Sequence, residues 1–139
     1  MDILNFTTNN DKVIELVNPV TGEPLLDEKK KPLSITVMSK HSKEYRLIER
    51  EIGFRAKKLK EPNADKMEFN EFSDAYEEVA ALGTEFLART VTACNLVMNS
   101  KALKANKEDM IAVFSDERTA WVREQVESAN ADTEAFTKG

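Results

Sequence analysis

The chain is poor in the residues that most catalytic and metal sites require. Its 139 residues include one cysteine, Cys94, and one histidine, His41, so an internal disulfide or a Cys/His zinc site cannot be built within one chain. The chain contains no calcium-binding DxDxDG loop, no glycine-rich nucleotide-binding loop and no GxSxG nucleophile motif. We therefore expect no enzyme, and no catalytic, metal-binding or cofactor-binding residue.

Long apolar runs and an excess of positive charge are also missing. No run approaches the roughly 18 residues of a membrane-spanning helix, and the first residues lack the basic start and apolar stretch of a secretory signal. The formal net charge of −5 argues against general affinity for nucleic acid. These absences predict a soluble protein, made in the cytoplasm, that binds neither membrane nor nucleic acid.

The charges that are present are unevenly placed. Residues 40–60 hold eight basic and three acidic residues, whereas residues 61–92 hold eight acidic and two basic ones. The basic segment also lacks the interleaved aromatic residues of modules that stack on bases. If the two segments form neighbouring helices, we expect them to attract one another within a subunit or between subunits.

Two turn signals near the N-terminus separate apolar runs. In the first turn, Pro19 suits the second position and Gly22 suits a positive φ angle. The β-branched and apolar runs 13–17 and 33–38 predict strands, and 24–26 can add a short strand between them. We therefore expect a small antiparallel β unit over about 13–38, with one face covered by a helix.

The remainder of the chain favours helices. Apolar residues at spacings of three and four predict helices over about 42–60, 66–92, 107–114 and 116–130. Residues 95–103 fit either two short extended pieces about a turn or a loop. The predicted fold class is thus α+β in one domain, 1–139, with a β unit over 1–40, a helical part over 41–130 and a polar tail over 131–139, in which Phe136 can dock.

The longest predicted helix carries an aromatic face, and the last one carries the only tryptophan. The aromatic residues recur at near-heptad spacing, together with Val79 and Gly83, which fits either ordinary core or a surface for a helical partner. The tryptophan, near arginine and glutamine, fits the same two interpretations. The candidate partner-binding or packing residues are Phe69, Phe72, Tyr76, Phe86, Trp121 and Gln125.

The ordered set of these features resembles the tail assembly chaperones of long-tailed bacteriophages. The resemblance is carried by the turn at 18–25, by the strand and helix entry at 35–46, and by the segment 120–126 followed by Phe136. Together these elements span most of the chain from about residue 13 onward. The chain departs from similar sequences at Cys94-Asn95-Leu96, where they tend to place a tryptophan.

The resemblance implies a protein that binds the tape measure protein non-covalently and keeps it soluble during tail assembly. The implied partners are the tape measure protein and a frameshifted, longer form of the chain itself, and the chain is expected to form a homo-oligomer. The implied location is the host bacterial cytoplasm, with no place in the mature virion. The alternative is a virion structural protein, such as a minor tail or head-tail connector component, whose β unit joins a neighbour's sheet. A small enzyme with an unrecognised carboxylate site is a third hypothesis.

Overall fold

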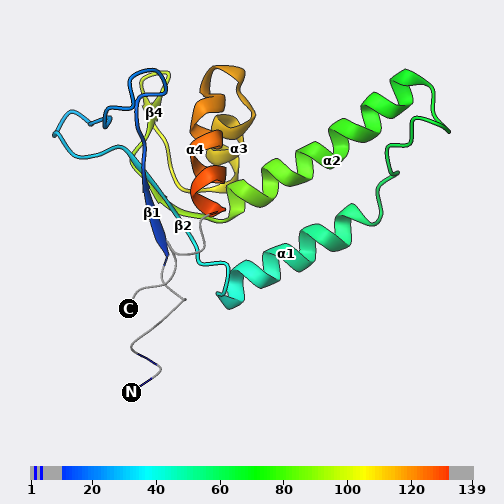
Figure 1. Ribbon diagram of the computed structural model, residues 1–139, viewed down its shortest axis with the longest axis horizontal. Helices are drawn as coiled ribbons and strands as arrows, with labels where there is room; N and C mark the ends of the chain where they lie inside the picture. Colours follow the sequence, from blue (N-terminus) through cyan, green and yellow to red (C-terminus); the bar gives the residue numbers. More distant parts are fainter. Residues whose placement is uncertain (1, 3, 5–10, 132–139) are drawn as a thin grey trace.

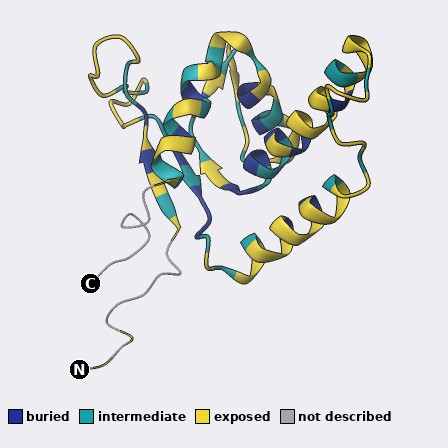
Figure 2. Ribbon diagram, turned by 45° about the vertical axis from the view of Figure 1, so that its right-hand side comes forward, coloured by how far each residue is buried: buried dark blue, intermediate teal, exposed yellow. Residues whose placement is uncertain are grey.

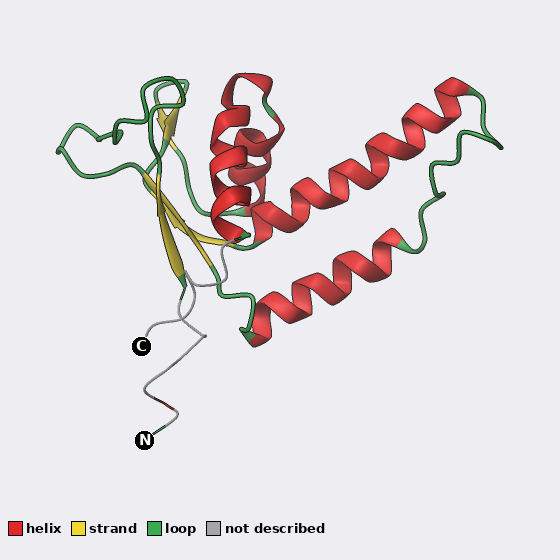
Figure 3. Ribbon diagram, viewed as in Figure 1, coloured by secondary structure: helices red, strands yellow, loops and turns green. Residues whose placement is uncertain are grey.

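The computed structural model describes residues 2, 4 and 11–131 of the chain. These residues form an α+β fold, as predicted, with a small antiparallel sheet followed by a mostly helical remainder (Figure 3). The predicted polar tail beyond Ala131, with the docking of Phe136, lies outside the described residues.

The main sheet has the strand order β1-β2-β3, and both pairings are antiparallel. Its strands are β1 (Lys12–Glu15), β2 (Ser34–Val37) and β3 (Val91–Cys94). The turn between β1 and β2 uses Gly22 at φ +76°, a left-handed conformation that costs glycine little, as predicted.

The predicted strand at 24–26 does not form. This segment makes only isolated bridges, between Val17 and Pro24 and between Leu26 and Pro32. Proline has no N–H to donate to a ladder, so two prolines at the bridge positions prevent a continuous strand. The third strand comes instead from β3, far along the chain.

The helices follow the predicted order, with a β-hairpin between the second and the third. The helices are α1 (Lys43–Ala56), α2 (Phe69–Arg89), α3 (Lys107–Ser115) and α4 (Ala120–Asn130). The hairpin pairs β4 (Val97–Met98) with β5 (Lys101–Ala102), and Asn99 and Ser100 turn between them with positive φ angles. Residues 95–103 therefore adopt the first of the two predicted alternatives.

The C-terminal end of α1 and the N-terminal end of α2 are both shorter than predicted. α1 stops before residue 60, because Lys58 and Leu59 donate to carbonyls three residues back, which tightens the chain ahead of Pro62. α2 starts after residue 66, because Asn63 Oδ1 accepts the N–H of Asp65 at 3.0 Å and stabilises a turn there.

Two further boundaries differ from the predictions. α2 ends before residue 92, because Thr90 Oγ1 donates to the carbonyl of Leu87 at 2.7 Å and the β-branched residues that follow pair with β2. α4 begins at Ala120 rather than 116, because Asp116 Oδ1 accepts the N–H of Arg118 at 2.8 Å and caps a short 3-10 turn first.

The sheet, α3, α4 and the C-terminal end of α2 enclose one hydrophobic core, and we call this part the body (Figure 1). Its most deeply buried side chains are at most 1% exposed and come from distant parts of the chain: Leu16, Ile35, Met110 and Val126. Figure 2 shows that the buried residues gather here.

Residues 43–82 project from the body as an arm made of α1, the connecting segment and the N-terminal part of α2 (Figure 1). α1 begins where Ser42 Oγ accepts the N–H of Tyr45 at 3.1 Å, a side-chain N-cap. The buried cluster between the two helices is small: Ile48 and Ile52 of α1 meet Leu82 of α2, and Met38, just after β2, joins them. Most other residues of the arm are exposed (Figure 2).

Candidate partner-binding surface

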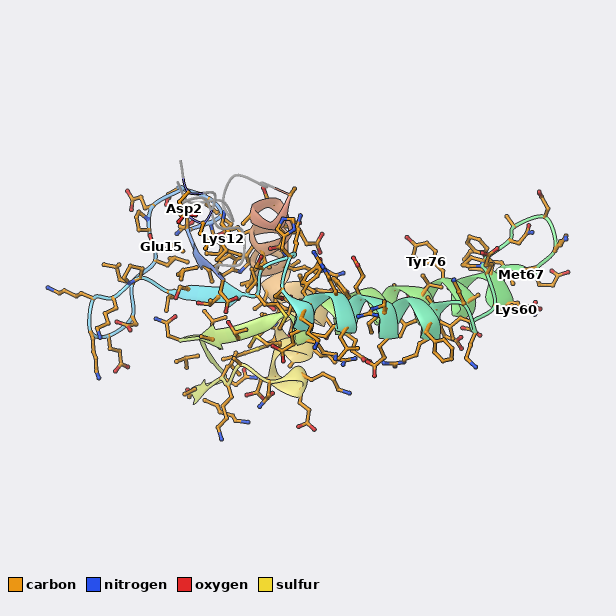
Figure 4. All side chains as sticks on the ribbon, turned by 90° about the horizontal axis from the view of Figure 1, so that it is seen from below. Asp2, Lys12, Glu15, Lys60, Met67 and Tyr76 are labelled. Carbon is orange, nitrogen blue, oxygen red and sulfur yellow. The ribbon has the colours of Figure 1, made fainter. Side chains whose placement is uncertain are left out.

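Four apolar side chains of α2 form a stripe along the arm. Phe69 is 77% exposed, Tyr76 59% and Val79 41%, and the ring centroid of the half-buried Phe72 lies 6.3 Å from that of Tyr76. Steps of three, four and three residues place the four on one helix face. Figure 4 shows Tyr76 projecting from one side of the arm. We call these four residues the α2 stripe.

The helix that carries the α2 stripe is acidic. Residues 69–88 contain five acidic residues and no basic one. Asp74 and Glu77 are exposed, and neither makes an ion pair with another described residue. Glu77 follows Tyr76 directly and lies about 100° around the helix from it. Asp74 is two residues from both Phe72 and Tyr76 and lies about 160° around the helix from each, so of these two carboxylates only Glu77 lies near the edge of the stripe.

The α2 stripe stays uncovered because α1 packs on a different side of α2. α1 turns Ile48 and Ile52 toward Leu82 of α2. At the base of the arm, the rings of Tyr45 and Phe86 meet edge to face, with centroids 5.3 Å apart. The inner side of α2 is therefore occupied, while the side that carries the stripe is open.

Ion pairs strengthen the contact between α1 and α2. Arg55 Nη2 donates to Glu85 Oε1 at 3.1 Å, and further pairs join Arg89 to Glu51 and Lys60 to Glu71. The hydrogen bond from Arg55 lowers the pKa of the Glu85 carboxyl below its ordinary value. Two of these pairs, Arg55–Glu85 and Lys60–Glu71, join the basic segment to the acidic segment as predicted, whereas Arg89–Glu51 has the reverse sense.

A second apolar surface lies on α1 and was not among the predicted site residues. Leu47 and Phe54 are each 61% exposed, and Lys58 Nζ lies 4.6 Å from the centre of the Phe54 ring. The two residues line a groove of about 670 Å³, to which the body contributes Ala88, Val91, Ala105 and Lys107.

The signal for this second surface is present in the sequence. Leu47 and Phe54 are seven residues apart and so lie on one side of a helix. Lys43, Arg50 and Lys57 repeat at the same interval beside them. We call these five residues the α1 face. Leu47 and Phe54 were not predicted as site residues, because the apolar pattern on the inward side of the same helix is stronger.

The structure separates the six candidate residues into three groups. Phe69, Phe72 and Tyr76 belong to the α2 stripe, whereas Phe86 packs against Tyr45 between the two helices of the arm. Trp121 and Gln125 lie on α4 in the body. Trp121 is half-buried against the core. The candidates therefore do not form one surface.

Gln125 has a structural contact that accounts for its position. Its Oε1 accepts the N–H of Val17 at 2.9 Å, and its Nε2 donates to the carbonyl of Val17 at 2.8 Å. The side-chain amide thus pairs with the backbone just beyond β1, as a neighbouring strand would. Because both of its polar atoms are used, Gln125 ties α4 to the sheet.

The two residues most often associated with catalysis lie in ordinary surroundings. Cys94 is half-buried, and burial raises the pKa of its thiol, which favours the unreactive protonated form. The exposed His41 donates its backbone N–H to Ser39 Oγ at 3.1 Å, near the start of α1. Among residues 2, 4 and 11–131, no group of three or more His, Cys, Asp and Glu is arranged to hold a metal ion.

Comparison of the chain with protein-family models, with curated proteins and with solved structures gave no match. None of the helices in the described part of the chain is long and apolar enough to cross a membrane. The exposed apolar surfaces of the arm are therefore the features from which a function can be argued.

Proposed function

We propose that this chain is a binding protein that covers apolar helices of a partner, and specifically a tail assembly chaperone for the tape measure protein of a long-tailed bacteriophage. The observation that carries the proposal is the α2 stripe, with Phe69 77% and Tyr76 59% exposed on a projecting arm. The particular client comes from the family resemblance of the turn at 18–25 and the segment 120–126.

The α2 stripe has the form of a surface for a helix. Two helices pack when apolar residues at spacings of three and four interdigitate, and Phe69, Phe72, Tyr76 and Val79 provide that spacing on one side. Contiguous exposed apolar surface on a folded protein commonly marks an interaction site. The formal net charge of −5 helps to keep the free protein soluble.

The same surface suits transient binding better than permanent assembly. The stripe is one helix wide and is reached from solvent, so a partner helix can bind and leave without unfolding the body. We therefore propose that the chain acts in the host cytoplasm and is absent from the finished virion. Mass spectrometry of purified particles tests this point, because a fixed stoichiometry of the chain in the virion contradicts it.

The alternative, a virion structural protein, requires a sheet edge open to a neighbouring strand. Gln125 occupies the backbone N–H and carbonyl of Val17 at the end of β1. At the β1 edge, an added strand would have to displace this side chain or pair only along Lys12–Glu15, whereas the other edge of the sheet is β3, Val91–Cys94. This contact restricts strand addition at one of the two sheet edges.

Co-expression with the tape measure protein tests the proposed function. We expect the wild-type chain to keep the tape measure protein in the soluble fraction. The double substitution Phe69→Ser and Tyr76→Ser should return most of it to the pellet, because the stripe loses its two most exposed aromatic rings.

A matched control changes exposed apolar residues of the body. Val20 is 91% exposed and Val97 66% exposed, and both lie away from the arm. The double substitution Val20→Ser and Val97→Ser should leave the client soluble. The proposal is wrong if the wild-type chain has no effect on solubility, or if the stripe variant, still folded by circular dichroism, performs as well as the wild type.

A further inference from the structure

α1 covers part of an apolar face on α2 that is wider than the α2 stripe. At about 100° per residue, Phe86 lies about 20° and Leu82 about 60° around the helix from Val79, which forms the edge of the stripe. The apolar face from Leu82 to Phe69 is therefore continuous over about 140°. α1 packs on the Leu82 side of this face and leaves the stripe open.

The buried contact that holds α1 on this face is small. The two buried residues of α1 are Ile48 and Ile52, and both meet Leu82. Among the described residues, the core cluster of the body contains none from α1. A groove of about 670 Å³ lies between α1 and the start of α3. α1 can therefore leave α2 without opening the core of the body.

The ion pairs between the two helices permit the same movement. Arg55 pairs with Glu85, and Arg89 pairs with Glu51. The side chains of Arg55 and Glu51 are 45% and 51% exposed, so these pairs contribute little to stability. When α1 leaves, the nearly buried Glu85 keeps a partner, because Nη1 of Arg89 on the same helix lies 3.4 Å from its Oε2.

The chain on both sides of α1 allows it to swing. The twelve residues 57–68 belong to no helix or strand, and they link Ala56 to Phe69 at the tip of the arm (Figure 1). Extended, they span about 40 Å, several times the diameter of a helix. At the other end, the N–H of Met38 donates to the carbonyl of Thr90 at 2.9 Å and ties the chain to the body. The C-terminal end of α1 therefore has enough chain to move away from α2.

We infer that α1 is a displaceable cover, and that an amphipathic helix of the client takes its place on α2. The inference rests on the proposed function for the identity of this helix, and it names the face that receives it. Leu82 and Phe86 then join the α2 stripe in one binding face.

α1 itself shows which chemistry this face accepts. Its inward residues Tyr45, Ile48 and Ile52 are three and four positions apart, and the ring of Tyr45 meets that of Phe86 edge to face. A helix with apolar residues at the same spacing can therefore occupy the same side of α2. A client helix with a broader apolar face also covers the stripe, which α1 leaves open. This additional apolar contact favours the client over α1.

Thiol labelling of the free protein tests whether α1 opens. Cys94→Ser removes the natural thiol, and a single cysteine then replaces either Leu82, which is 8% exposed, or Val113 in the body core, which is 2% exposed. Under native conditions, Leu82→Cys should react with a maleimide at least about tenfold faster than Val113→Cys, because α1 opens without unfolding of the body.

A matched pair of substitutions on α1 sharpens this measurement. Arg55→Met removes the ion pair with Glu85 and should raise the labelling rate of Leu82→Cys about threefold. Lys57→Met removes an exposed cation that makes no ion pair with another described residue, and it should leave the rate unchanged. All variants need an unchanged circular dichroism spectrum. If Leu82→Cys does not fold, Ile48→Cys reports from the α1 side of the same contact.

The co-purified complex with the tape measure protein tests the replacement itself. Ile48→Cys should label faster in the complex than in the free protein, because α1 is displaced. Leu82→Cys should label more slowly in the complex, because the client helix covers it. Opposite changes at two residues that touch in the free protein are the result expected for an exchange of helices.

Two results would overturn the inference. In the free protein, thiols at positions 82 and 113 could react at the same slow rate, with or without Arg55→Met, so that α1 opens only when the body unfolds. In the complex, the thiols at 48 and 82 could keep their free-protein rates, which would show a client bound with α1 in place and would leave the proposed function standing. If the wild-type chain holds no tape measure protein, the proposed function fails, and replacement by this client fails with it.

Discussion

The body and the arm bury their apolar residues to very different extents. In the body, side chains from the sheet, α3 and α4 close around one core, and Ile35, Met110 and Val126 are at most 1% exposed. In the arm, α1 and α2 cover each other on one side only, and large apolar side chains face solvent on two other sides. The difference suggests that the body supplies stability and that the arm presents surfaces.

The largest expected effect compares one phenylalanine from each region. Phe114 is 3% exposed in the body core, whereas Phe69 is 77% exposed on the arm. Phe114→Ala should lower the free energy of unfolding by about 3–5 kcal/mol, because it leaves a cavity. Phe69→Ala should change it by less than about 0.5 kcal/mol. Urea denaturation followed by circular dichroism measures both, and equal losses would remove the distinction between the regions.

The second prediction concerns the contact between the helices of the arm. Ile52 is 9% exposed and belongs to the small cluster there. Ile52→Ala should weaken that contact by about 2–4 kcal/mol. In hydrogen exchange, amides of α1 should exchange faster while those of β2 and α4 keep their rates, because the arm opens separately.

The exposed Leu47 on the same helix provides the control, and Leu47→Ala should leave exchange in α1 nearly unchanged. If Ile52→Ala accelerates exchange in β2 and α4 as much as in α1, arm and body unfold as one cooperative unit.

The third prediction concerns the link between α4 and the sheet. Gln125→Ala removes both hydrogen bonds to the backbone of Val17, so the unfolding free energy should fall by about 1–2 kcal/mol. The neighbouring exposed Glu124 has no such contact, and Glu124→Ala should have almost no effect in the same denaturation experiment. If Gln125→Ala lowers the unfolding free energy as little as Glu124→Ala does, water replaces the side-chain amide of Gln125 at no cost in stability.

The smallest expected effect is the pH dependence of the ion pair between Arg55 and Glu85. Arg55 holds the pKa of Glu85 below its ordinary value in the folded state. The pair therefore stabilises the fold above the unfolded-state pKa near 4.5, and this contribution disappears as pH falls through the lower folded-state pKa.

The difference in unfolding free energy between the wild type and Glu85→Gln should accordingly be present at pH 7 and should vanish in acid. With Arg55→Met in both backgrounds, the difference should be small at every pH. A difference that persists at low pH, or that survives the loss of Arg55, would assign the effect to something other than this pair.

The sequence predicted the order of elements better than their partners. The turn at Gly22, the two N-terminal strands and the helices follow from local patterns that need few distant contacts. β3 was missed because Val91–Cys94 directly follows a strongly amphipathic helix, and its strand form depends on pairing with β2, far away in the sequence.

The candidate surface was predicted only in part, for a similar reason. Spacing places Phe69, Phe72, Tyr76 and Phe86 near one face of a helix, but it cannot say which part α1 or the body will cover. Phe86 packs against Tyr45, whereas Phe69 is exposed to solvent. The contact of Gln125 with Val17 bridges residues 108 apart in sequence, so no local pattern could reveal it.

The most direct test of the central claim is hydrogen exchange of the chain alone and in complex with co-purified tape measure protein. If a client helix binds the α2 stripe, amides of residues 69–79 should become more protected in the complex, while those of α4, residues 120–130, keep their rates. Protection confined to α4 or to the sheet, with none at 69–79, would contradict the assignment of partner binding to the arm.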